Sequence, residues 1–408
     1  MSEAGAADPF LEAAEALGQQ IWKGRARAAD GTITWIRPGS ETRGEPVDSQ
    51  KRIDPYLYDG TAGIALFLAA LSHVIGSGSW RDRALQALSP VRRKFAELSA
   101  DPERAARITG IRLGGMVGLG SLVYSFLQIG QLLGEPTLHD EALRIAGLIT
   151  PDRIDRDESL DVLYGSAGAI LALTQLADEV FLTTATACAR NLLARRQVAE
   201  SGHRVWRTAP GLPPLGGFSH GAAGICYALL RLYRQIGDPE LLAAAREGFN
   251  FEGTLYSPER GCWRDPRAEG EISVSPGWCL GSAGMALARH SALDVLNDPE
   301  LHGEVEQALA HTRAAPLQNI DHLCCGNLGR VDCLLEAGWT TAAKELAHLV
   351  LERAADRGTL AWRRIMPSQL FDPTFFTGAA GVGYALLRLA APSLPCVLAL
   401  KSGGLRHL

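Results

Sequence analysis

Three cysteines in the C-terminal half of the chain stand in a setting that suits a metal ion. Cys279 lies two residues before a Gly-Ser-Ala-Gly element, and Cys324 and Cys325 lie two and one residues before a Gly-Asn-Leu-Gly element. Three thiolates fit a tetrahedral Zn²⁺ with one position left open, which is the pattern of catalytic zinc sites, whereas structural sites usually have four protein ligands. Because an adjacent Cys-Cys pair is not a usual zinc-finger spacing, the prediction depends on the surrounding elements.

These cysteines could instead be core thiols, because Cys is among the residue types that are most often fully buried. We expect that fate for Cys188, Cys226, Cys333 and Cys396, which lie within helical or tail segments. Cys262 is a possible fourth thiol, but it lies in a loop outside the spacing pattern described below. The metal interpretation is therefore confined to the other three cysteines.

Two residues of other types are candidates for proton transfer. His220 directly precedes a Gly-Ala-Ala-Gly element, and Asp161 lies four residues before a Gly-Ser-Ala-Gly element. A lone histidine is more often structural, and an aspartate near the start of a helix often caps that helix. The positions of both residues relative to the repeated elements favour an acid/base pair.

The elements that position these residues form an internal repeat. A Gly-x-x-Gly element, followed by an apolar stretch rich in Ala and Leu, recurs along the chain at intervals of 45 to 60 residues. Such self-similarity is the sequence signature of a repeat architecture. The seven copies are Gly60–Gly63, Gly115–Gly118, Gly165–Gly168, Gly221–Gly224, Gly281–Gly284, Gly326–Gly329 and Gly378–Gly381.

Each copy predicts the start of a buried helix, because the stretch after it is apolar on more than one face. Between the copies lie segments whose charges cluster on one side, which is typical of helices that face water. These segments are residues 10–22, 83–98, 141–149, 183–196, 239–251, 303–312 and 341–354. The sequence therefore predicts an all-α fold of seven helical hairpins, with seven inner and seven outer helices.

Repeat units that cannot bury their apolar faces alone must stack on their neighbours. Because no terminal repeat has an obviously polar capping helix, we expect the array to close into an α/α toroid, a double-layered barrel, rather than to form an open solenoid. The predicted domain spans residues 10–400. We expect residues 1–9 to be a disordered N-terminus and residues 401–408 to be a C-terminal tail.

The repeat also predicts where the candidate residues meet. If every Gly-x-x-Gly element starts an inner helix, the residues just before it lie on loops at one end of the barrel. The candidate cysteines, His220 and Asp161 come from four repeats and would converge on this mouth. We also expect the N-termini of the inner helices to present unpaired N–H groups and a positive dipole end, which favour thiolates.

Composition narrows the class of protein. Of the residues, 47% are hydrophobic and 21% charged, as in a globular protein with a sizeable core, and the net charge of −5 indicates no nucleic-acid partner. The N-terminus has no apolar region of a signal peptide, and no apolar run predicts an integral membrane segment. Eight cysteines without a secretion signal favour reduced thiols, so we expect a cytoplasmic protein.

Taken together, the seven elements and two motifs resemble the lanthionine synthetase C-like cyclase family. The motifs are Trp278-Cys279-Leu-Gly and Cys324-Cys325-Gly-Asn, and the resemblance covers residues 10–400. Residues 34–40, 54–71 and 381–400 and the Cys-Cys-Gly motif look most like the C-terminal cyclase domain of class II lanthipeptide synthetases.

The resemblance implies an α/α toroid with one zinc ion per chain. Cys279 and Cys324 match the first two zinc ligands, and Cys325 falls where many members have histidine. His220 and Asp161 match the acid/base pair proposed for the family. Nisin-type cyclases carry an arginine four residues before the first ligand and a tyrosine directly after it, where this chain has Ser275 and Leu280, so that no role of that pair is carried over.

The implied activity is Michael-type addition of a peptide cysteine thiol to dehydroalanine or dehydrobutyrine, which forms (methyl)lanthionine thioether rings. The implied partners are a dehydrated precursor peptide and a dehydratase, either fused or separate, so the chain is a standalone cyclase or an excised domain. Three alternatives remain open. They are addition of glutathione to dehydrated peptides, a peptide-binding scaffold with structural zinc, and a carbohydrate-active toroid that uses Asp161 with Asp59 or Asp321.

Overall fold

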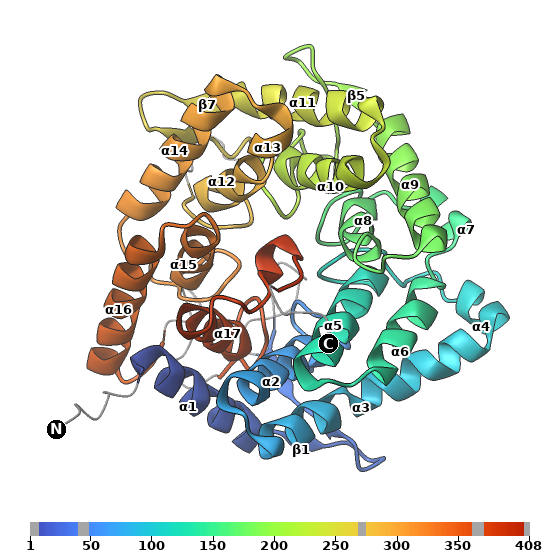
Figure 1. Ribbon diagram of the computed structural model, residues 1–408, viewed down its shortest axis with the longest axis vertical. Coiled ribbons are helices and arrows are strands. Elements are labelled where there is room, and N and C mark those ends of the chain that lie inside the picture. Colours follow the sequence, from blue (N-terminus) through green and yellow to red (C-terminus); the bar gives the residue numbers. More distant parts are fainter. Residues whose placement is uncertain (1–7, 40–48, 268–274, 361–370, 404–408) are drawn as a thin grey trace.

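The computed structural model describes residues 8–39, 49–267, 275–360 and 371–403. Its helices form two concentric layers (Figure 1). The inner layer consists of α2 (Thr61–Ile75), α5 (Leu119–Leu133), α8 (Ser166–Leu173), α10 (Ala222–Ile236), α12 (Ser282–His290), α15 (Asn327–Glu336) and α17 (Ala379–Ala390). The outer layer consists of α1 (Pro9–Lys23), α3 (Gly78–Ala100), α6 (Thr137–Ala146), α9 (Glu179–Ala194), α11 (Pro239–Gly253), α14 (Pro299–Ala314) and α16 (Thr340–Arg357).

The inner helices form a closed ring. Each packs against the inner helix before and after it, and the last, α17, packs against the first, α2 (Figure 1). Six inner helices pair with the outer helix that follows them in sequence, whereas α17 pairs with α1 from the other end of the chain. The predicted closed all-α toroid is therefore confirmed, and its seventh helix pair is assembled from the two ends of the chain.

Inner and outer helices differ in how many of their faces are buried. In the inner helix α2, every residue from Thr61 to Leu71 is buried, so that the helix is apolar all round. In the outer helix α6, burial is confined to Leu138, Ala142, Ile145 and Ala146, which lie on one face. The outer helices thus present one stripe to the inner ring and their charged residues to solvent.

The Gly-x-x-Gly elements let each loop fold back over the first turn of its inner helix. At the start of α12, a Cβ on Gly281 would lie 1.8 Å from the Ser275 carbonyl oxygen, and one on Gly284 would lie 2.0 Å from that of Trp278. The same loop caps the helix, since the N–H of Ser282 donates to the Ser275 carbonyl. Only residues without a side chain fit so close an approach.

This capping corrects the expectation of unpaired N–H groups at the mouth. In six inner helices the first N–H donates to the carbonyl of the residue seven positions earlier, and in α8 the N–H of Ser166 donates to the carboxylate of Asp157 at 2.6 Å. The first N–H of every inner helix is therefore already hydrogen-bonded to its own loop.

The predicted start of the second inner helix, after Gly115, was wrong. The helix α5 begins at Leu119, after Gly118, whereas the other inner helices begin after the first glycine of their element. Gly118 is the N-cap, with a φ of 143°, and Ser121 stands where the other repeats have their second glycine. Gly115 instead occupies the position three residues before the N-cap.

Short elements connect the layers. Among the described residues, the remaining helices are α4 (Pro102–Arg107), α7 (Pro151–Asp155), α13 (Leu293–Leu296) and the 3₁₀ helix η2 (Val397–Ala399). The strands form antiparallel pairs, which are β1 (Ala26–Arg27) with β2 (Ile33–Thr34), β3 (Ile36–Pro38) with β4 (Gln50–Arg52), β5 (Gln197–Val198) with β6 (Arg204–Val205), and β7 (Tyr256–Ser257) with β8 (Cys262–Trp263).

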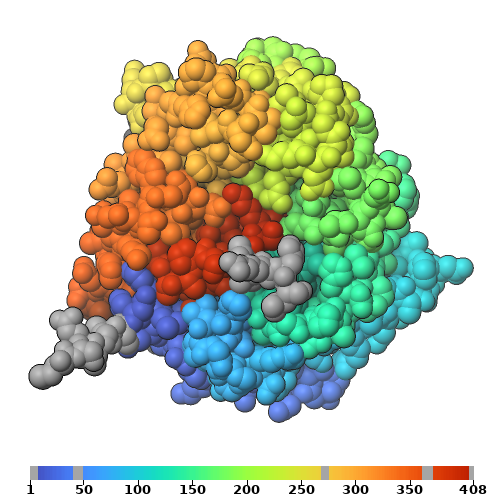
Figure 2. Space-filling model, in the orientation of Figure 1, coloured from blue at the N-terminus to red at the C-terminus, as the bar shows by residue number. Residues whose placement is uncertain are grey.

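Both ends of the described chain are anchored. The carboxylate of Asp8 caps α1 by accepting from the N–H of Phe10 at 2.9 Å, so that helical structure begins at Pro9. Residues 1–7 of the expected disordered N-terminus, and residues 404–408 of the tail, lie outside the described residues. The C-terminal segment, including η2, lies at the centre of the ring (Figures 1 and 2).

Within the described ranges, no helix combines the length and the apolarity that a membrane crossing requires.

Candidate metal centre

The loops before the inner helices are joined by a closed ring of main-chain hydrogen bonds. In each loop, the residue two positions before the N-cap glycine donates its N–H to the carbonyl of the equivalent residue in a neighbouring loop. The bonds run from Tyr58 to Met116 (3.0 Å), Met116 to Leu163 (3.3 Å), Leu163 to Ser219 (3.2 Å), Ser219 to Cys279 (3.0 Å), Cys279 to Cys324 (3.2 Å), Cys324 to Phe376 (3.0 Å) and Phe376 to Tyr58 (2.8 Å). We call these seven residues the loop ring.

The loop ring brings the predicted site residues to one end of the toroid. Cys279 and Cys324 are neighbouring members of the ring, and Cys325 follows directly in the second of these loops. His220 follows the ring member Ser219, and Asp161 lies two residues before the ring member Leu163. Four consecutive loops therefore carry all five residues.

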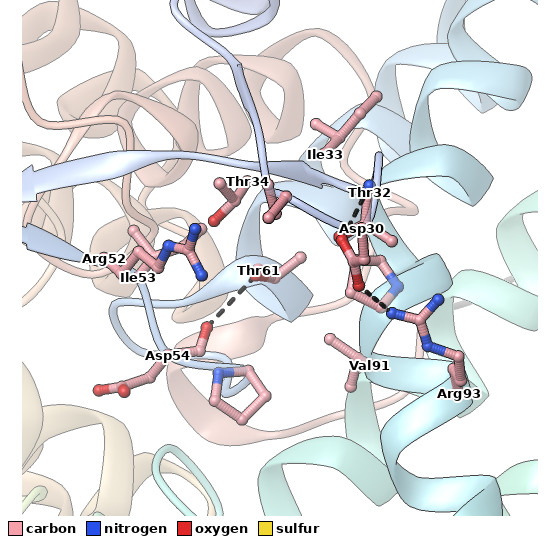
Figure 3. A pocket seen from close by; sticks show the side chains of 14 residues that line it. Asp30, Thr32, Ile33, Thr34, Arg52, Ile53, Asp54, Thr61, Val91 and Arg93 are labelled. Carbon is pink, nitrogen blue, oxygen red and sulfur yellow. Dashed lines mark hydrogen bonds and ion pairs between the residues drawn. The ribbon is translucent and has the colours of Figure 1, made fainter.

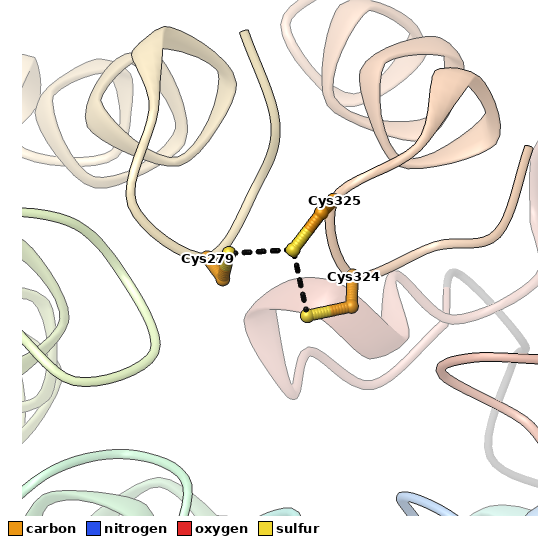
Figure 4. A group of neighbouring side chains, drawn as sticks. All are labelled: Cys279, Cys324 and Cys325. Carbon is orange, nitrogen blue, oxygen red and sulfur yellow. Dashed lines mark hydrogen bonds between the residues drawn. The ribbon is translucent and has the colours of Figure 1, made fainter. Parts of the chain in front are cut away.

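The three thiols converge (Figure 4). The sulfur of Cys325 lies 2.9 Å from that of Cys279 and 3.4 Å from that of Cys324, and all three sulfurs lie within 4.8 Å of one another. Cys279 and Cys324 are only 8% and 7% exposed, and Cys325 is partly exposed. In the part of the chain that the structure describes, this is the one cluster of Cys, His, Asp or Glu that suits a metal ion.

The donor set fits zinc. Sulfurs on a tetrahedral zinc, with Zn–S bonds of about 2.3 Å, lie about 3.8 Å apart. The sulfur of Cys325 would therefore move away from the other two by under about 1 Å. Hydrogen bonds from the thiols of Cys279 and Cys325 hold the pKa of Cys324 well below its ordinary value. The bond to Cys324 raises the pKa of Cys279 well above its ordinary value. One thiolate therefore forms readily, and three together require a cation.

His220 and Asp161 are hydrogen-bonded to each other. Asp161 Oδ2 lies 2.7 Å from His220 Nδ1, and Asp161 Oδ1 accepts from the N–H of Tyr164 at 2.7 Å. The Asp161 side chain is fully buried, whereas that of His220 is 31% exposed. Burial lowers the pKa of His220, but the hydrogen bond and charge of Asp161 outweigh burial, so that the pKa lies above its ordinary value. Asp161 thus orients the ring and favours the imidazolium.

Three further residues at the site were not predicted. Burial and the neighbouring Cys324 raise the pKa of Tyr58 well above its ordinary value, and the ring of Tyr58 stacks on Phe376 with centroids 4.8 Å apart. His322 is 7% exposed and accepts the N–H of Cys325 at 3.4 Å. The exposed Arg267 is paired with Asp265 at 2.7 Å, and its positive charge acts on Cys279, Cys325 and His220.

The sequence carried a signal for one of these residues. Tyr58 occupies the same position in its repeat as Cys279 and Cys324, so that the register alone identifies it as a member of the mouth. His322 lies within the loop of the second motif, but nothing in its spacing distinguishes it. Arg267 lies outside the register, and no pattern in the sequence indicates its approach to the cysteines.

The remaining cysteines and carboxylates have other surroundings. Cys188, Cys226, Cys333 and Cys396 are buried in the core, as expected, and the thiol of Cys396 also donates to the carboxylate of Asp332 at 3.8 Å. Asp59 forms a buried ion pair with Arg37 at 3.6 Å, and Asp321 is paired with Arg353. A cavity of about 370 Å³ lies between the N-terminal strands and α3 (Figure 3). None of the five predicted residues lines it.

Comparison with known proteins identifies the architecture. The model of the family described as "Lanthionine synthetase C-like protein" matches residues 52–399. The chain belongs to this family. No curated protein matches the sequence. Among solved structures, nisin cyclase is 16% identical, with a TM-score of 0.63 over 85% of this chain and 92% of that chain.

Other solved structures match with lower TM-scores. The α-1,6-mannanase from Salegentibacter sp. HEL1_6 is 13% identical, with a TM-score of 0.45 over 94% of this chain and 99% of that chain. An unsaturated glucuronyl hydrolase specific for heparin is 12% identical, with a TM-score of 0.44 over 79% of this chain and 87% of that chain. The lanthionine synthetase C-like family, and with it a cyclase fold, is therefore assigned to this chain through the family match.

Proposed function

We propose that this protein is a zinc-dependent lanthipeptide cyclase, closest to the cyclase domain of class II lanthipeptide synthetases. It would add peptide cysteine thiols to dehydroalanine or dehydrobutyrine. The observation that carries the proposal is the convergence of Cys279, Cys324 and Cys325, from two adjacent loops, with their sulfurs within 4.8 Å. Three protein ligands leave one position for a substrate, as in catalytic zinc sites.

The reaction needs a thiolate and a proton donor. Zinc held by the three cysteines would stabilise a bound thiolate at neutral pH. The peptide sulfur forms a bond to the β-carbon of the dehydro residue, whose C=C π bond breaks, and a proton is added at the α-carbon. The S–H and C=C bonds are thus replaced by S–C and C–H bonds, with no net oxidation or reduction.

His220 is the proton donor in this proposal. Its Nδ1 is held by Asp161, so Nε2 remains for the substrate, and its raised pKa favours the protonated form. Asp161 is the positioning residue, because it is buried and hydrogen-bonded to His220, through which it would act on the substrate. General acid catalysis of this kind typically contributes about 10²–10⁴-fold to a rate.

The substrate and setting follow from this chemistry. The peptide must arrive already dehydrated, so a dehydratase, fused or separate, supplies it. All eight cysteines, each within the described residues, are free thiols. Because zinc-binding thiols and substrate thiols must stay reduced, we place the reaction in the cytoplasm.

Incubation with a dehydrated peptide that contains one cysteine and one dehydroalanine tests the proposal. We expect the free thiol, counted by alkylation and mass spectrometry, to disappear without a change in peptide mass. Treating the protein with a chelator should abolish this loss, and zinc should restore it.

Three results would contradict the proposal. In the presence of glutathione, a peptide that gains the mass of glutathione and keeps its own thiol would identify intermolecular addition instead. A peptide that binds but keeps its free thiol with zinc present would indicate a non-catalytic scaffold. Chelator-treated protein that still cyclises the peptide would remove the role of zinc.

A further inference from the structure

The C-terminal segment fills the centre of the toroid. Residues Leu394–Lys401, which we call the plug, follow α17 and lie among the inner helices (Figures 1 and 2). Leu398 and Leu400 are fully buried, and Leu394, Cys396 and Val397 are at most 2% exposed. The plug is therefore part of the core of the ring and not a surface tail.

Side chains from five repeats bind the carbonyl groups of the plug. Each donor belongs to a different inner helix or to the loop next to it, so the plug connects neighbouring repeats and also repeats on opposite sides of the ring. The bonds run from Tyr384 to the carbonyl of Pro395 (2.9 Å), Trp278 to Leu398 (3.1 Å), Tyr227 to Ala399 (3.0 Å), Gln175 to Leu400 (2.8 Å) and Tyr124 to Lys401 (3.0 Å). A sixth repeat is reached through the ion pair of Lys401 with Glu336 at 2.9 Å.

The plug also reaches the loop ring itself. A buried residue directly precedes each ring member. In five loops it has a large side chain, and in the other two it is Val162 or Gly115, which has no side chain. The five large residues are Leu57, Phe218, Trp278, Leu323 and Phe375. A Cβ on Gly115 would lie 2.4 Å from Leu400 Cδ1. The Leu400 side chain thus occupies the space that the missing side chain leaves.

Trp278 links the plug to the metal centre. It immediately precedes Cys279, is fully buried, and packs between the rings of Phe218 and Phe376, with centroid distances of 5.6 and 5.2 Å. Its indole N–H donates to the Leu398 carbonyl of the plug. Cys279 is also held on both sides, since its N–H donates to Cys324 and its carbonyl accepts from Ser219.

We propose that the plug supports the loop ring from inside the toroid, and that Trp278 is the positioning residue through which the plug holds Cys279 in place for zinc. The proposal rests on the proposed function for the identity of the metal only. The effect on the loop ring is a property of the protein without metal, and can be measured there.

Trp278→Phe tests this role by removing one N–H and little volume. Trp35→Phe is the matched control, because Trp35 is equally buried and its indole N–H donates to the Ile21 carbonyl at 2.8 Å, outside the loop ring. In metal-free protein, we expect amide hydrogen exchange around Cys279 and Cys324 to be about tenfold faster or more in Trp278→Phe than in the control. Zinc affinity, measured by competition with a chromophoric chelator, should fall about 10- to 100-fold.

A second variant tests the plug independently of Trp278. Leu400→Ala should speed exchange in the loop around Met116, on the opposite side of the ring from Trp278. Leu192→Ala in α9, equally buried in the core but outside the plug, should not change that loop's exchange relative to other loops.

Exchange in the loop ring that is the same in each variant and its control would overturn the proposal, whatever the zinc affinity. Faster exchange with unchanged zinc affinity would overturn the role of Trp278 toward the metal. If the wild-type protein bound no zinc, the proposed function would fail, but the exchange comparison would still decide whether the plug supports the ring.

Discussion

Cys325 differs from the other two thiols in its place within the loop. Cys279 and Cys324 are members of the loop ring, whereas Cys325 occupies the next position, equivalent to that of His220. Its sulfur lies close to both other sulfurs and completes the cluster. Replacing Cys325 therefore changes the charge of the site and disturbs the loop ring less than replacing Cys279 or Cys324 does.

Cys325→His is expected to retain zinc and to cyclise more slowly. Histidine supplies a neutral ligand, so the site loses one negative charge and donates fewer electrons to the metal. A substrate sulfur held there becomes less nucleophilic, which should slow ring closure on the order of tenfold. Single-turnover rates at matched zinc content measure this effect. Unchanged or faster closure would show that the third thiolate does not make the substrate sulfur more reactive.

The His220–Asp161 pair predicts a pH dependence with a definite sign. If protonated His220 donates the proton, the rate falls as pH rises through the pKa of His220, which Asp161 holds above its ordinary value. Asp161→Asn removes the charge and lowers that pKa, so the falling limb of the pH–rate profile should move to lower pH. Glu158→Gln, an exposed carboxylate in the same loop, is the control. A limb that stays in place in Asp161→Asn would exclude His220 as the acid.

For single residues, the sequence predicted candidates of reactive type at fixed distances from the repeated glycines. It did not single out Tyr58, although Tyr58 shares that register, and it missed residues outside the register. Cys279, Cys324 and His220 were predicted because each has a fixed distance from a glycine that starts a helix. The approach of Arg267 to the thiols depends on contacts between segments that share no motif, which spacing does not encode. The pairing of Asp161 with His220 likewise depends on two loops that lie 59 residues apart in sequence.

The elements depend on glycines that tolerate no side chain. The first turn of each inner helix is covered by its own loop, so the two glycines of an element play steric roles and are not sites of flexibility. The sequence predicted these helices and their starting points in six of the seven repeats. It failed at Gly118, because Ser121 replaces the second glycine and Gly115 supplied a false match at the same spacing.

Two alanine substitutions separate the steric role from helix propensity. Gly284→Ala in α12 places a Cβ 2.0 Å from the Trp278 carbonyl oxygen, and should lower the free energy of unfolding by about 2–3 kcal/mol. Gly303→Ala in the outer helix α14 meets no atom within 4 Å and should raise it by about 0.5–1 kcal/mol. Chemical denaturation measures both. Equal effects of the same sign would show that the close approach at Gly284 is not needed.

On the scale of the whole molecule, the two chain ends complete the ring. The N-terminal helix α1 is the outer partner of α17, and the segment after α17 becomes the plug. The sequence predicted closure, because no terminal repeat has a polar capping helix. It did not predict the pairing of the two chain ends, the loop ring or the plug, because these depend on contacts between residues that are far apart in sequence and share no motif.

Because the ring is closed, we expect a destabilising substitution in α1 to lower the stability of the entire ring. Ile21→Ala, at a fully buried position, should cost about 2–5 kcal/mol and lower the midpoint of one cooperative transition. Val180→Ala, at a position 68% exposed in α9, should change stability by under about 0.5 kcal/mol. Circular dichroism and tryptophan fluorescence should report the same midpoint. Separate melting of α1 before the rest would indicate an array that behaves as an open solenoid.

The central claim is that Cys279, Cys324 and Cys325 together bind one zinc ion. Elemental analysis of the purified protein tests it most directly, with Cys279→Ala and Cys324→Ala beside Cys188→Ala, which removes a buried thiol outside the cluster. We predict about one zinc per chain in the wild type and in Cys188→Ala, and under about one-tenth of that in the other two variants. Zinc retained in full by Cys279→Ala or Cys324→Ala, or absent from a wild-type protein that still cyclises peptides, would contradict this claim.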